Sequence, residues 1–216
     1  MTVASATVQP TAHALGQSLG HGFWYDWGGL NQALFLWINH LSFPGRDALA
    51  QAGTFVGAHQ WYPVYIAVAL TLAYARPQWL APERVLVLVW GYLISWAVIA
   101  TLKPFFDFPR PLAVLGEPLV HVAGRPEFAH SFPSGHAAFV FLLLGSLAPG
   151  AGRPLRWGLV FLAFWVIWSR MAVGAHFPVD VLGGALIGLT SAGLAHLAIR
   201  PWRRRSRDAG DLLRGR

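Results

Sequence analysis

The sequence predicts an all-α protein, a polytopic bundle of about six transmembrane helices. Of its 216 residues, 55% are hydrophobic and 12% are charged, whereas soluble domains carry roughly 25% charged residues. Eleven Trp and five Tyr residues suit membrane–water interfaces, where amphipathic rings are enriched. The absence of Cys excludes disulfides, thiolate nucleophiles and Cys-based metal sites. We therefore expect an integral membrane protein with one domain.

The N-terminal part divides into a polar and an apolar segment. Residues 1–22 are polar and small and lack the positively charged start of a signal peptide. We expect them to form a separate segment that is ordered only in part. Residues 23–43 are mostly apolar but contain Asp26, Asn31 and Asn39. They predict either a first spanning helix or a helix that lies in the membrane interface.

Five further apolar runs predict the other spanning helices. The first of them, residues 61–75, gives only about 22 Å of helix and must extend into its flanks to cross a core of about 30 Å. The second, residues 85–102, carries no charge and should end before Lys103-Pro104, because proline disfavours helix in the residue before it. The remaining three runs lie at residues 133–149, 157–169 and 178–199.

Polar stretches separate these runs and close the chain. Residues 44–60 predict a turn and a small amphipathic helix at the membrane surface. Residues 103–135 are rich in proline and charge, and so long a stretch without apolar periodicity is usually functional or disordered. We expect one membrane domain over residues 23–199. Residues 200–216 hold seven Arg and two Asp, which predicts a basic cytoplasmic tail rather than a nucleic-acid-binding element.

Charge also predicts the orientation in the membrane. If each run crosses, then Arg76, Arg84, Arg153 and Arg156 lie on the same side as the basic tail. Basic connections mark the cytoplasmic side. The long polar stretch then lies on the opposite face, which in a bacterial inner membrane is periplasmic.

Three blocks of polar residues fall on this opposite face. Together they contain three cations, two histidines and one carboxylate. This inventory suits a tetrahedral oxyanion with a leaving group, meaning a phosphate ester or anhydride. Because the cations can neutralise charge in the transition state, we expect no metal and no cofactor. The blocks are Lys103, six residues, Arg110-Pro111; Pro133-Ser134-Gly135-His136; and Ser169-Arg170, five residues, His176, three residues, Asp180.

All three blocks contain groups that can hold phosphate. Arg110 and Arg170 can each grip two phosphate oxygens through a planar guanidinium. Lys103 adds a point charge. Ser134 and Gly135 open a predicted helix, and backbone N–H groups at the start of a helix bind anions. These five residues are therefore predicted to bind the substrate phosphate.

The two histidines are predicted to carry the reaction. His176 and Asp180 are four residues apart, so the carboxylate can reach back to the imidazole. This contact fixes the tautomer and makes the other ring nitrogen a better nucleophile, which would form a phosphohistidine. His136 comes from another helix and can protonate the leaving oxygen as a general acid.

The three blocks resemble the signature of the type 2 phosphatidic acid phosphatase superfamily. All three parts of that signature occur without substitution, and the resemblance covers roughly residues 85–199. The superfamily includes bacterial undecaprenyl diphosphate, phosphatidylglycerophosphate and lipid A phosphatases. The resemblance implies a metal-free phosphatase of lipid phosphates. It implies His176 as the nucleophile oriented by Asp180, His136 as the acid, and Lys103, Arg110, Ser134, Gly135 and Arg170 as phosphate ligands.

The substrate is not determined by these motifs. Undecaprenyl diphosphate is the best guess from its frequency among bacterial relatives. The alternatives are lipid A, phosphatidylglycerophosphate, a phosphotransferase that uses polyprenyl diphosphate, and a non-catalytic carrier that binds lipid phosphate. Head group, chain length and oligomeric state stay open. Outside the motifs, we expect Ser169 to make a local hydrogen bond and the other polar residues of the long stretch to be solvated: Asp107, Glu117, His121, Arg125, Glu127 and His130.

Overall fold

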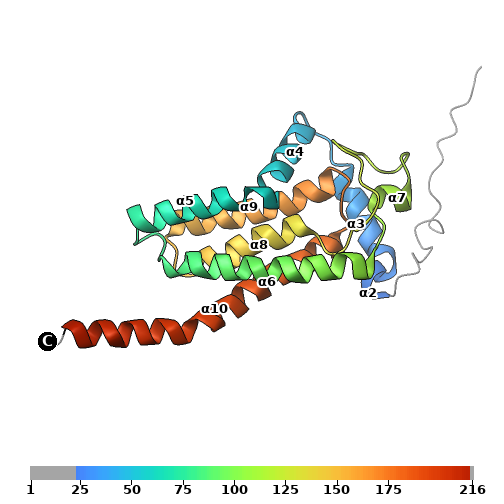
Figure 1. Ribbon diagram of the computed structural model, residues 1–216. Coiled ribbons are helices and arrows are strands. Elements are labelled where there is room, and N and C mark those ends of the chain that lie inside the picture. Colours follow the sequence, from blue (N-terminus) through green and yellow to red (C-terminus); the bar gives the residue numbers. More distant parts are fainter. Residues whose placement is uncertain (1–22, 215–216) are drawn as a thin grey trace, which may run out of the picture.

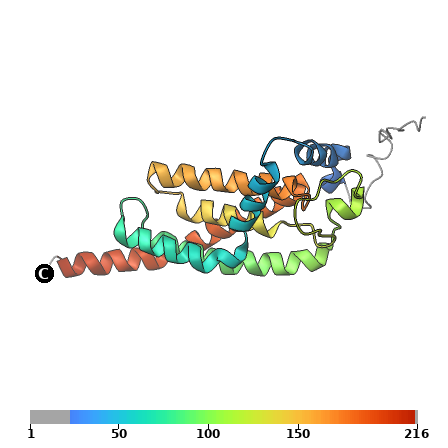
Figure 2. The ribbon, with the colours of Figure 1, turned by 90° about the horizontal axis from the view of Figure 1, so that it is seen from above.

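The structure is a computed structural model that describes the backbone of residues 23–214 and the side chains as far as residue 199. The polar segment predicted over residues 1–22, and the side chains of the basic tail, lie outside this description. Within residues 23–214 every regular element is a helix, so the predicted all-α fold is confirmed. Five helices lie alongside one another in a bundle (Figures 1 and 2): α5 (Tyr62–Ala75), α6 (Glu83–Phe106), α8 (Gly135–Leu147), α9 (Arg153–Ala172) and α10 (Pro178–Arg214).

The bundle has the composition of an integral membrane protein, but its helices differ in reach. By length and apolar composition, three described segments could cross a membrane: Glu83–Leu115, Arg153–Ala172 and Pro178–Ile199. Helices α5 and α8 have 14 and 13 residues and rise only about 20 Å each, so they need their flanking residues to cross about 30 Å. The predicted bundle is therefore confirmed, whereas the predicted number of about six spans is not.

Residues 23–43 do not form a spanning helix. The chain makes a short helix α2 (Phe23–Asp26), a 3₁₀ turn η1 (Trp27–Gly29) and helix α3 (Leu30–Asn39). Gly28 and Gly29 have positive φ angles of 65° and 91°, and they break the helix between α2 and α3. The ten residues of α3 rise only about 15 Å. The alternative of a spanning helix is therefore wrong.

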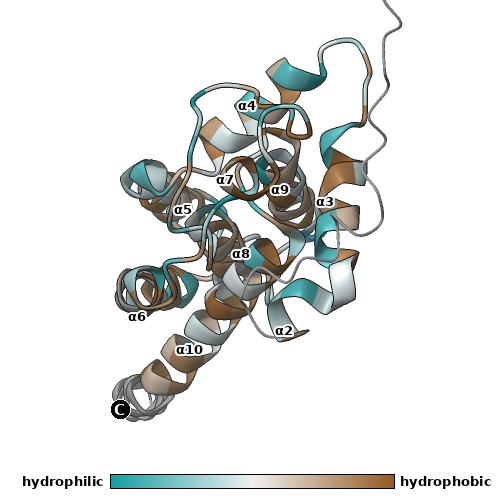
Figure 3. Cartoon of the chain, turned by 90° about the vertical axis from the view of Figure 1, so that its right-hand side faces the viewer, coloured by the Kyte–Doolittle hydropathy of each residue, from teal (hydrophilic) through white to brown (hydrophobic). Residues whose placement is uncertain are grey.

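The polar residues of α3 explain its position. The Asn31 side chain accepts a hydrogen bond from the backbone N–H of Val179 at 3.0 Å. The Asn39 amide donates to the carbonyls of Met171 and Ala172 at 3.2 and 3.1 Å. Helix ends leave backbone groups unpaired, so these two residues satisfy the start of α10 and the end of α9. Segment α2–α3 (residues 23–39), called the collar below, thus packs against one side of one end of the bundle (Figure 3).

The segment over residues 44–60 and the end of α6 differ in detail from the predictions. The small amphipathic helix predicted within residues 44–60 is α4 (Arg46–Val56), and it is followed by the 3₁₀ turn η2 (His59–Trp61). Helix α6 does not end before Pro104 but continues to Phe106. Pro104 lacks the N–H that would bond the carbonyl four residues earlier, and α6 ends two residues after it. The long polar stretch also contains one short helix, α7 (Pro111–Leu115).

Close packing of α8 against α10 brings the predicted blocks together. A Cβ atom at Gly184 would lie 2.3 Å from the Ser134 carbonyl oxygen, and one at Gly188 would lie 2.2 Å from the Ala138 carbonyl oxygen. Only glycine permits this backbone approach, as in other small-xxx-small helix pairs. The Ser134 N–H donates to the Asp180 carbonyl at 3.0 Å. The two helices therefore begin side by side, at the end against which the collar packs.

Candidate active site

Arg110 occupies the centre of the site. It directly precedes α7, and its side chain is buried between the long stretch and the α9–α10 connection. Its Nε donates to the Ala129 carbonyl at 2.8 Å, and its Nη1 donates to the Ala175 carbonyl at 3.1 Å. The same Nη1 lies 3.4 Å from Nε2 of His176. These backbone contacts fix the guanidinium beside the predicted nucleophile.

Arg170 and Lys103 add two more cations from other helices. Arg170 lies in the last turn of α9 with only 3% of its surface exposed. Its Nη1 contacts the Thr54 hydroxyl at 3.4 Å, while its buried Nε has no hydrogen-bond partner within the described part of the chain. Lys103, in the last turn of α6, donates to the His130 carbonyl at 2.8 Å. The cations therefore converge from three directions.

The start of α8 contributes the second block. Ser134 is the N-cap residue, and its hydroxyl accepts from the Ala137 N–H at 3.5 Å. Gly135 is the first helical residue, and the space that a Cβ atom would occupy there is open to 4 Å. An open helix start with a polar cap suits an anion. Ser134 and Gly135 thus lie where a phosphate could approach the backbone.

His176 lies beside Asp180, and both are almost completely buried. The distance from His176 Nδ1 to Asp180 Oδ2 is 3.4 Å, longer than an ordinary charge-assisted hydrogen bond. Nδ1 accordingly makes no hydrogen bond in the described structure. The carboxylate is adjacent to the ring, as expected, but it is held by other donors. The opposite ring nitrogen, Nε2, faces Arg110.

Three donors that the motif analysis did not single out orient Asp180. Ser131 Oγ and the Phe177 N–H donate to Asp180 Oδ2 at 2.5 and 2.8 Å. Tyr25 Oη donates to Oδ1 at 2.9 Å. Ser131 lies three residues before Ser134, which could have drawn attention to it. Tyr25 belongs to the collar, and no spacing in the sequence connects it with Asp180.

Burial lowers the pKa of His176 well below its usual value, and the neighbouring charge of Arg110 lowers it further, followed by those of Arg170, Lys103 and His136. The same burial raises the pKa of Tyr25, with Asp180 as the second cause. The imidazole of His176 is therefore neutral and can attack. The Tyr25 hydroxyl keeps its proton and can donate it to Asp180.

His136 lines a cavity of about 300 Å³ next to these residues. The cavity is also lined by Thr54, Arg170 and Glu127. His136 and His176 act on each other electrostatically and lie at the same end of the bundle. The structure thus brings all eight predicted site residues to one place, from α6, α8, α9, α10 and the segments between them.

Glu127 was expected to be solvated, and that expectation is wrong. Its Oε2 contacts Nη1 of Arg110, and its Oε1 lies 3.5 Å from Nη2 of Arg170. The side chain is 37% exposed. A carboxylate without a helical or motif context gives no signal in the sequence. Two buried guanidinium groups nevertheless require an anion, since an unpaired buried charge is costly.

The other polar residues of the long stretch pair at its surface. His130 Nδ1 lies 2.9 Å from Asp107, and His121 Nε2 lies 3.0 Å from Asp47. Glu117 and Arg125 are exposed. Ser169 donates to the Val166 carbonyl at 2.7 Å, which confirms its local role. Among the side chains that the structure describes, no three from His, Asp or Glu form a group that could hold a metal ion.

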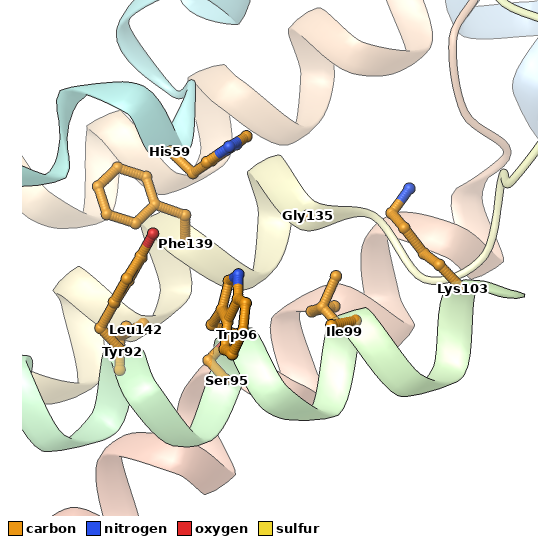
Figure 4. Close-up of a pocket in the computed structure, with 10 residues that line it drawn as sticks. His59, Tyr92, Ser95, Trp96, Ile99, Lys103, Gly135, Phe139 and Leu142 are labelled. Carbon is orange, nitrogen blue, oxygen red and sulfur yellow. The ribbon is translucent and has the colours of Figure 1, made fainter.

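An apolar cavity of about 230 Å³ begins at Lys103 and Gly135 and follows α6 and α8 away from them (Figure 4). Lys103 and Gly135 lie at one end, and Tyr92 and Leu142 lie at the other. Lys103 lies eleven positions after Tyr92, which corresponds to about 16 Å along α6. Tyr92, at the far end, stacks on Tyr62 with ring centroids 3.7 Å apart.

Comparison with known proteins agrees with this geometry. The family model described as the PAP2 superfamily matches residues 84–204. An undecaprenyl-diphosphatase of Sulfolobus acidocaldarius is 32% identical over 165 residues, which cover 74% of each chain. The bacitracin transport permease protein BcrC of Bacillus licheniformis is 39% identical over 83 residues, 38% of this chain and 39% of that protein. The crystal structure of Aquifex aeolicus LpxE superposes with a TM-score of 0.67 and 30% identity, over 77% of this chain and 94% of that chain.

The fold and the three blocks define a membrane phosphatase of the lipid phosphate class. The chain belongs to the PAP2 superfamily. The resemblance found from the motifs and the predicted enzyme class, a hydrolase of lipid phosphates, are confirmed at this level.

Proposed function

We propose that this protein removes a phosphate or diphosphate head group from a membrane lipid through a phosphohistidine at His176. The observation that carries the proposal is the position of His176 Nε2, 3.4 Å from Arg110 Nη1, among two further cations and an open helix start. Arg110 is fixed by backbone carbonyls before any substrate arrives. Such preorganised charge is the main source of catalysis in phosphoryl transfer.

The reaction proceeds in two displacements. Nε2 of His176 attacks phosphorus, and the bond to the leaving oxygen breaks while His136 gives that oxygen a proton. A water molecule then attacks the phosphohistidine, the P–N bond breaks, and His136 takes the proton of the water. Arg110, Arg170, Lys103 and the α8 start hold the non-bridging oxygens throughout. Asp180 is a positioning residue that orients His176.

The best-supported substrate is undecaprenyl diphosphate, which loses its terminal phosphate. The similar protein of Sulfolobus acidocaldarius carries the name undecaprenyl-diphosphatase. The apolar cavity along α6 and α8 could take the first part of a lipid chain, since its axis leads from Lys103 into the bundle (Figure 4). Lipid A and phosphatidylglycerophosphate are the alternative head groups, and a lipid acceptor in place of water would make the protein a phosphotransferase.

The orientation follows from the two ends of the bundle. The connections that carry Arg76 and Arg153 meet at one end, where the Gly152 N–H donates to the Trp79 carbonyl at 3.0 Å. The site lies at the other end. With the basic end in the cytoplasm, the site faces the periplasm of a bacterial inner membrane, where diphosphate lipids released outside the cell could reach it.

A substrate panel tests this function. Purified protein in detergent with EDTA should release phosphate from polyprenyl diphosphate faster than from lipid A or phosphatidylglycerophosphate. Terminally ³²P-labelled substrate, quenched in alkali, should leave acid-labile label on the wild-type protein and none on His176→Ala. Label transferred to added lipid A in place of free phosphate would identify a phosphotransferase. Substrate binding without any phosphate release would identify the carrier alternative.

A further inference from the structure

The contacts of Glu127 concern the position that substrate phosphate must take. Its two carboxylate oxygens lie on two different guanidinium groups, those of Arg110 and Arg170. The residue lies in the irregular segment between α7 and α8. It is 37% exposed, whereas Arg110 and Arg170 are buried. An exposed residue thus supplies the anion for two buried cations.

The carboxylate and a phosphate cannot use these cations at the same time. Nη1 of Arg110 contacts Glu127 and also lies 3.4 Å from Nε2 of His176. A phosphorus atom in position for attack by Nε2 would place its oxygens on the same Nη1. Tetrahedral phosphate and planar carboxylate offer arginine the same oxygen pair. Glu127 therefore stands where a substrate oxygen has to go.

We propose that Glu127 is an internal competitor for the phosphate position. In the free enzyme its carboxylate neutralises Arg110 and Arg170. The substrate phosphate displaces it, and it returns when inorganic phosphate leaves. This inference rests on the proposed function, because it takes phosphate to be the ligand of the two arginines. It assigns Glu127 a part in phosphate affinity and product release that is separate from the chemical step.

Arg110, the arginine that faces His176, can stay in place during this exchange. Arg110 keeps its bonds to the Ala129 and Ala175 carbonyls when the carboxylate moves. Glu127 is attached to a partly exposed loop position and can move into solvent. Exchange of one anion for another also avoids a stage with two unpaired buried cations, which would be costly. The dianionic phosphate neutralises more charge than the carboxylate, so the substrate is favoured.

The proposal predicts a change in affinity with a definite sign. A ligand that binds only the open form has its affinity reduced by the fraction of open form. If the carboxylate occupies the arginines about 90% of the time, its removal should tighten phosphate binding about tenfold. A residue that merely held the arginines in position would have the opposite effect, because its loss would weaken phosphate binding.

The test compares Glu127→Gln with wild type and with Glu117→Gln, an exposed carboxylate of the same segment. Inorganic phosphate and orthovanadate are titrated into each purified protein in detergent, by calorimetry and as competitive inhibitors. Glu127→Gln should bind both anions about tenfold more tightly, with a lower KM. Glu117→Gln should match wild type. Equal or weaker binding by Glu127→Gln would overturn the proposal, as would an equal gain in Glu117→Gln.

Thermal unfolding supplies a second measurement. Without phosphate, Glu127→Gln should unfold at a lower temperature than wild type, because Arg170 loses its counter-charge. Saturating phosphate should restore most of the difference. If Glu127→Gln is not recovered folded, Glu127→Asp shortens the carboxylate and should show a smaller tightening in the same titrations. No tightening in Glu127→Asp would then count against the proposal.

These outcomes separate this inference from the proposed function. Anion binding needs no turnover, so it can be measured even if no lipid phosphate is hydrolysed. A wild-type protein that binds phosphate but hydrolyses no member of the substrate panel would refute the function alone. An active wild type whose phosphate affinity is unchanged by Glu127→Gln would refute the role of Glu127 alone.

Discussion

His176 and His136 lie at the same end of the bundle, yet their surroundings differ. His176 is 1% exposed and lies between Asp180 and Arg110. His136 is only partly buried, lines the cavity that it shares with Thr54 and Arg170, and its ring makes no hydrogen bond within the described part of the chain. A fixed imidazole suits attack on phosphorus, whereas one that faces a cavity suits proton exchange with a leaving group and with water. Residue type alone would not separate these roles.

Removal of the fixed histidine should have the largest effect. We expect His176→Ala to lower kcat by at least about a thousandfold, because no other described side chain takes its place as nucleophile. Steady-state phosphate release from the best lipid substrate measures this loss. His40→Ala is the matched control, since His40 is exposed and contacts the Leu119 carbonyl. Activity in His176→Ala within tenfold of wild type would assign attack to another group.

The loss of activity on removal of His136, the histidine that lines the cavity, should depend on the leaving group. We expect His136→Asn to lower kcat about 10²–10⁴-fold with an alkyl phosphate, as general acids do. With a p-nitrophenyl phosphate, whose leaving oxygen needs no proton, the loss in the phosphorylation step should be much smaller. Single-turnover measurements of both substrates test the difference. An equal loss with both substrates would contradict the assignment of His136 as the acid and His176 as the nucleophile.

Removal of a donor to Asp180 should lower kcat less, because these donors only position the carboxylate. We expect Tyr25→Phe to lower kcat about tenfold with little change in KM, since one hydrogen bond to a charged group is lost. Tyr74→Phe is the matched control, because Tyr74 is 92% exposed. A purely structural role would instead lower the unfolding temperature and leave kcat per folded molecule unchanged. Ser131→Ala should behave as Tyr25→Phe does.

The smallest expected effect is on the pH dependence of stability. Because the pKa of His176 lies below the usual 6.5, its imidazole should stay neutral as the pH falls through 6.5. The unfolded chain takes up that proton and the folded protein does not. Stability should therefore decrease as the pH falls below about 6.5, and less so in His176→Asn. Unfolding temperatures between pH 5 and 8 test this, and a larger decrease in the variant would contradict the neutral state.

The sequence predicted the residues that converge at this end of the bundle better than it predicted the residues that support them. Lys103, Arg110, Ser134, Gly135, His136, Arg170, His176 and Asp180 could be found because each lies in a short motif at the edge of an apolar run. Ser131, Tyr25 and Glu127 could not, because their contacts join segments far apart in the chain. Glu127 resembled any other loop carboxylate until the buried guanidinium groups beside it were known.

The collar was missed for a related reason. Hydropathy along residues 23–43 cannot tell a helix that crosses lipid from one that lies across the end of a bundle. Asn31 and Asn39 were the available signal, since amides are expensive in lipid but suit unpaired helix ends. The extension of α6 past Pro104 was missed because the rule for the residue before proline is statistical and weakens in a last turn.

The collar also extends the contacts of the candidate site beyond the segment that matches the family. Tyr25 reaches Asp180, although it lies some sixty residues before the start of the family match at residue 84. A protein trimmed to the matched segment would retain every signature residue and lose part of what orients them. An exchange of N-terminal segments between superfamily members would, for the same reason, alter turnover without touching a single motif.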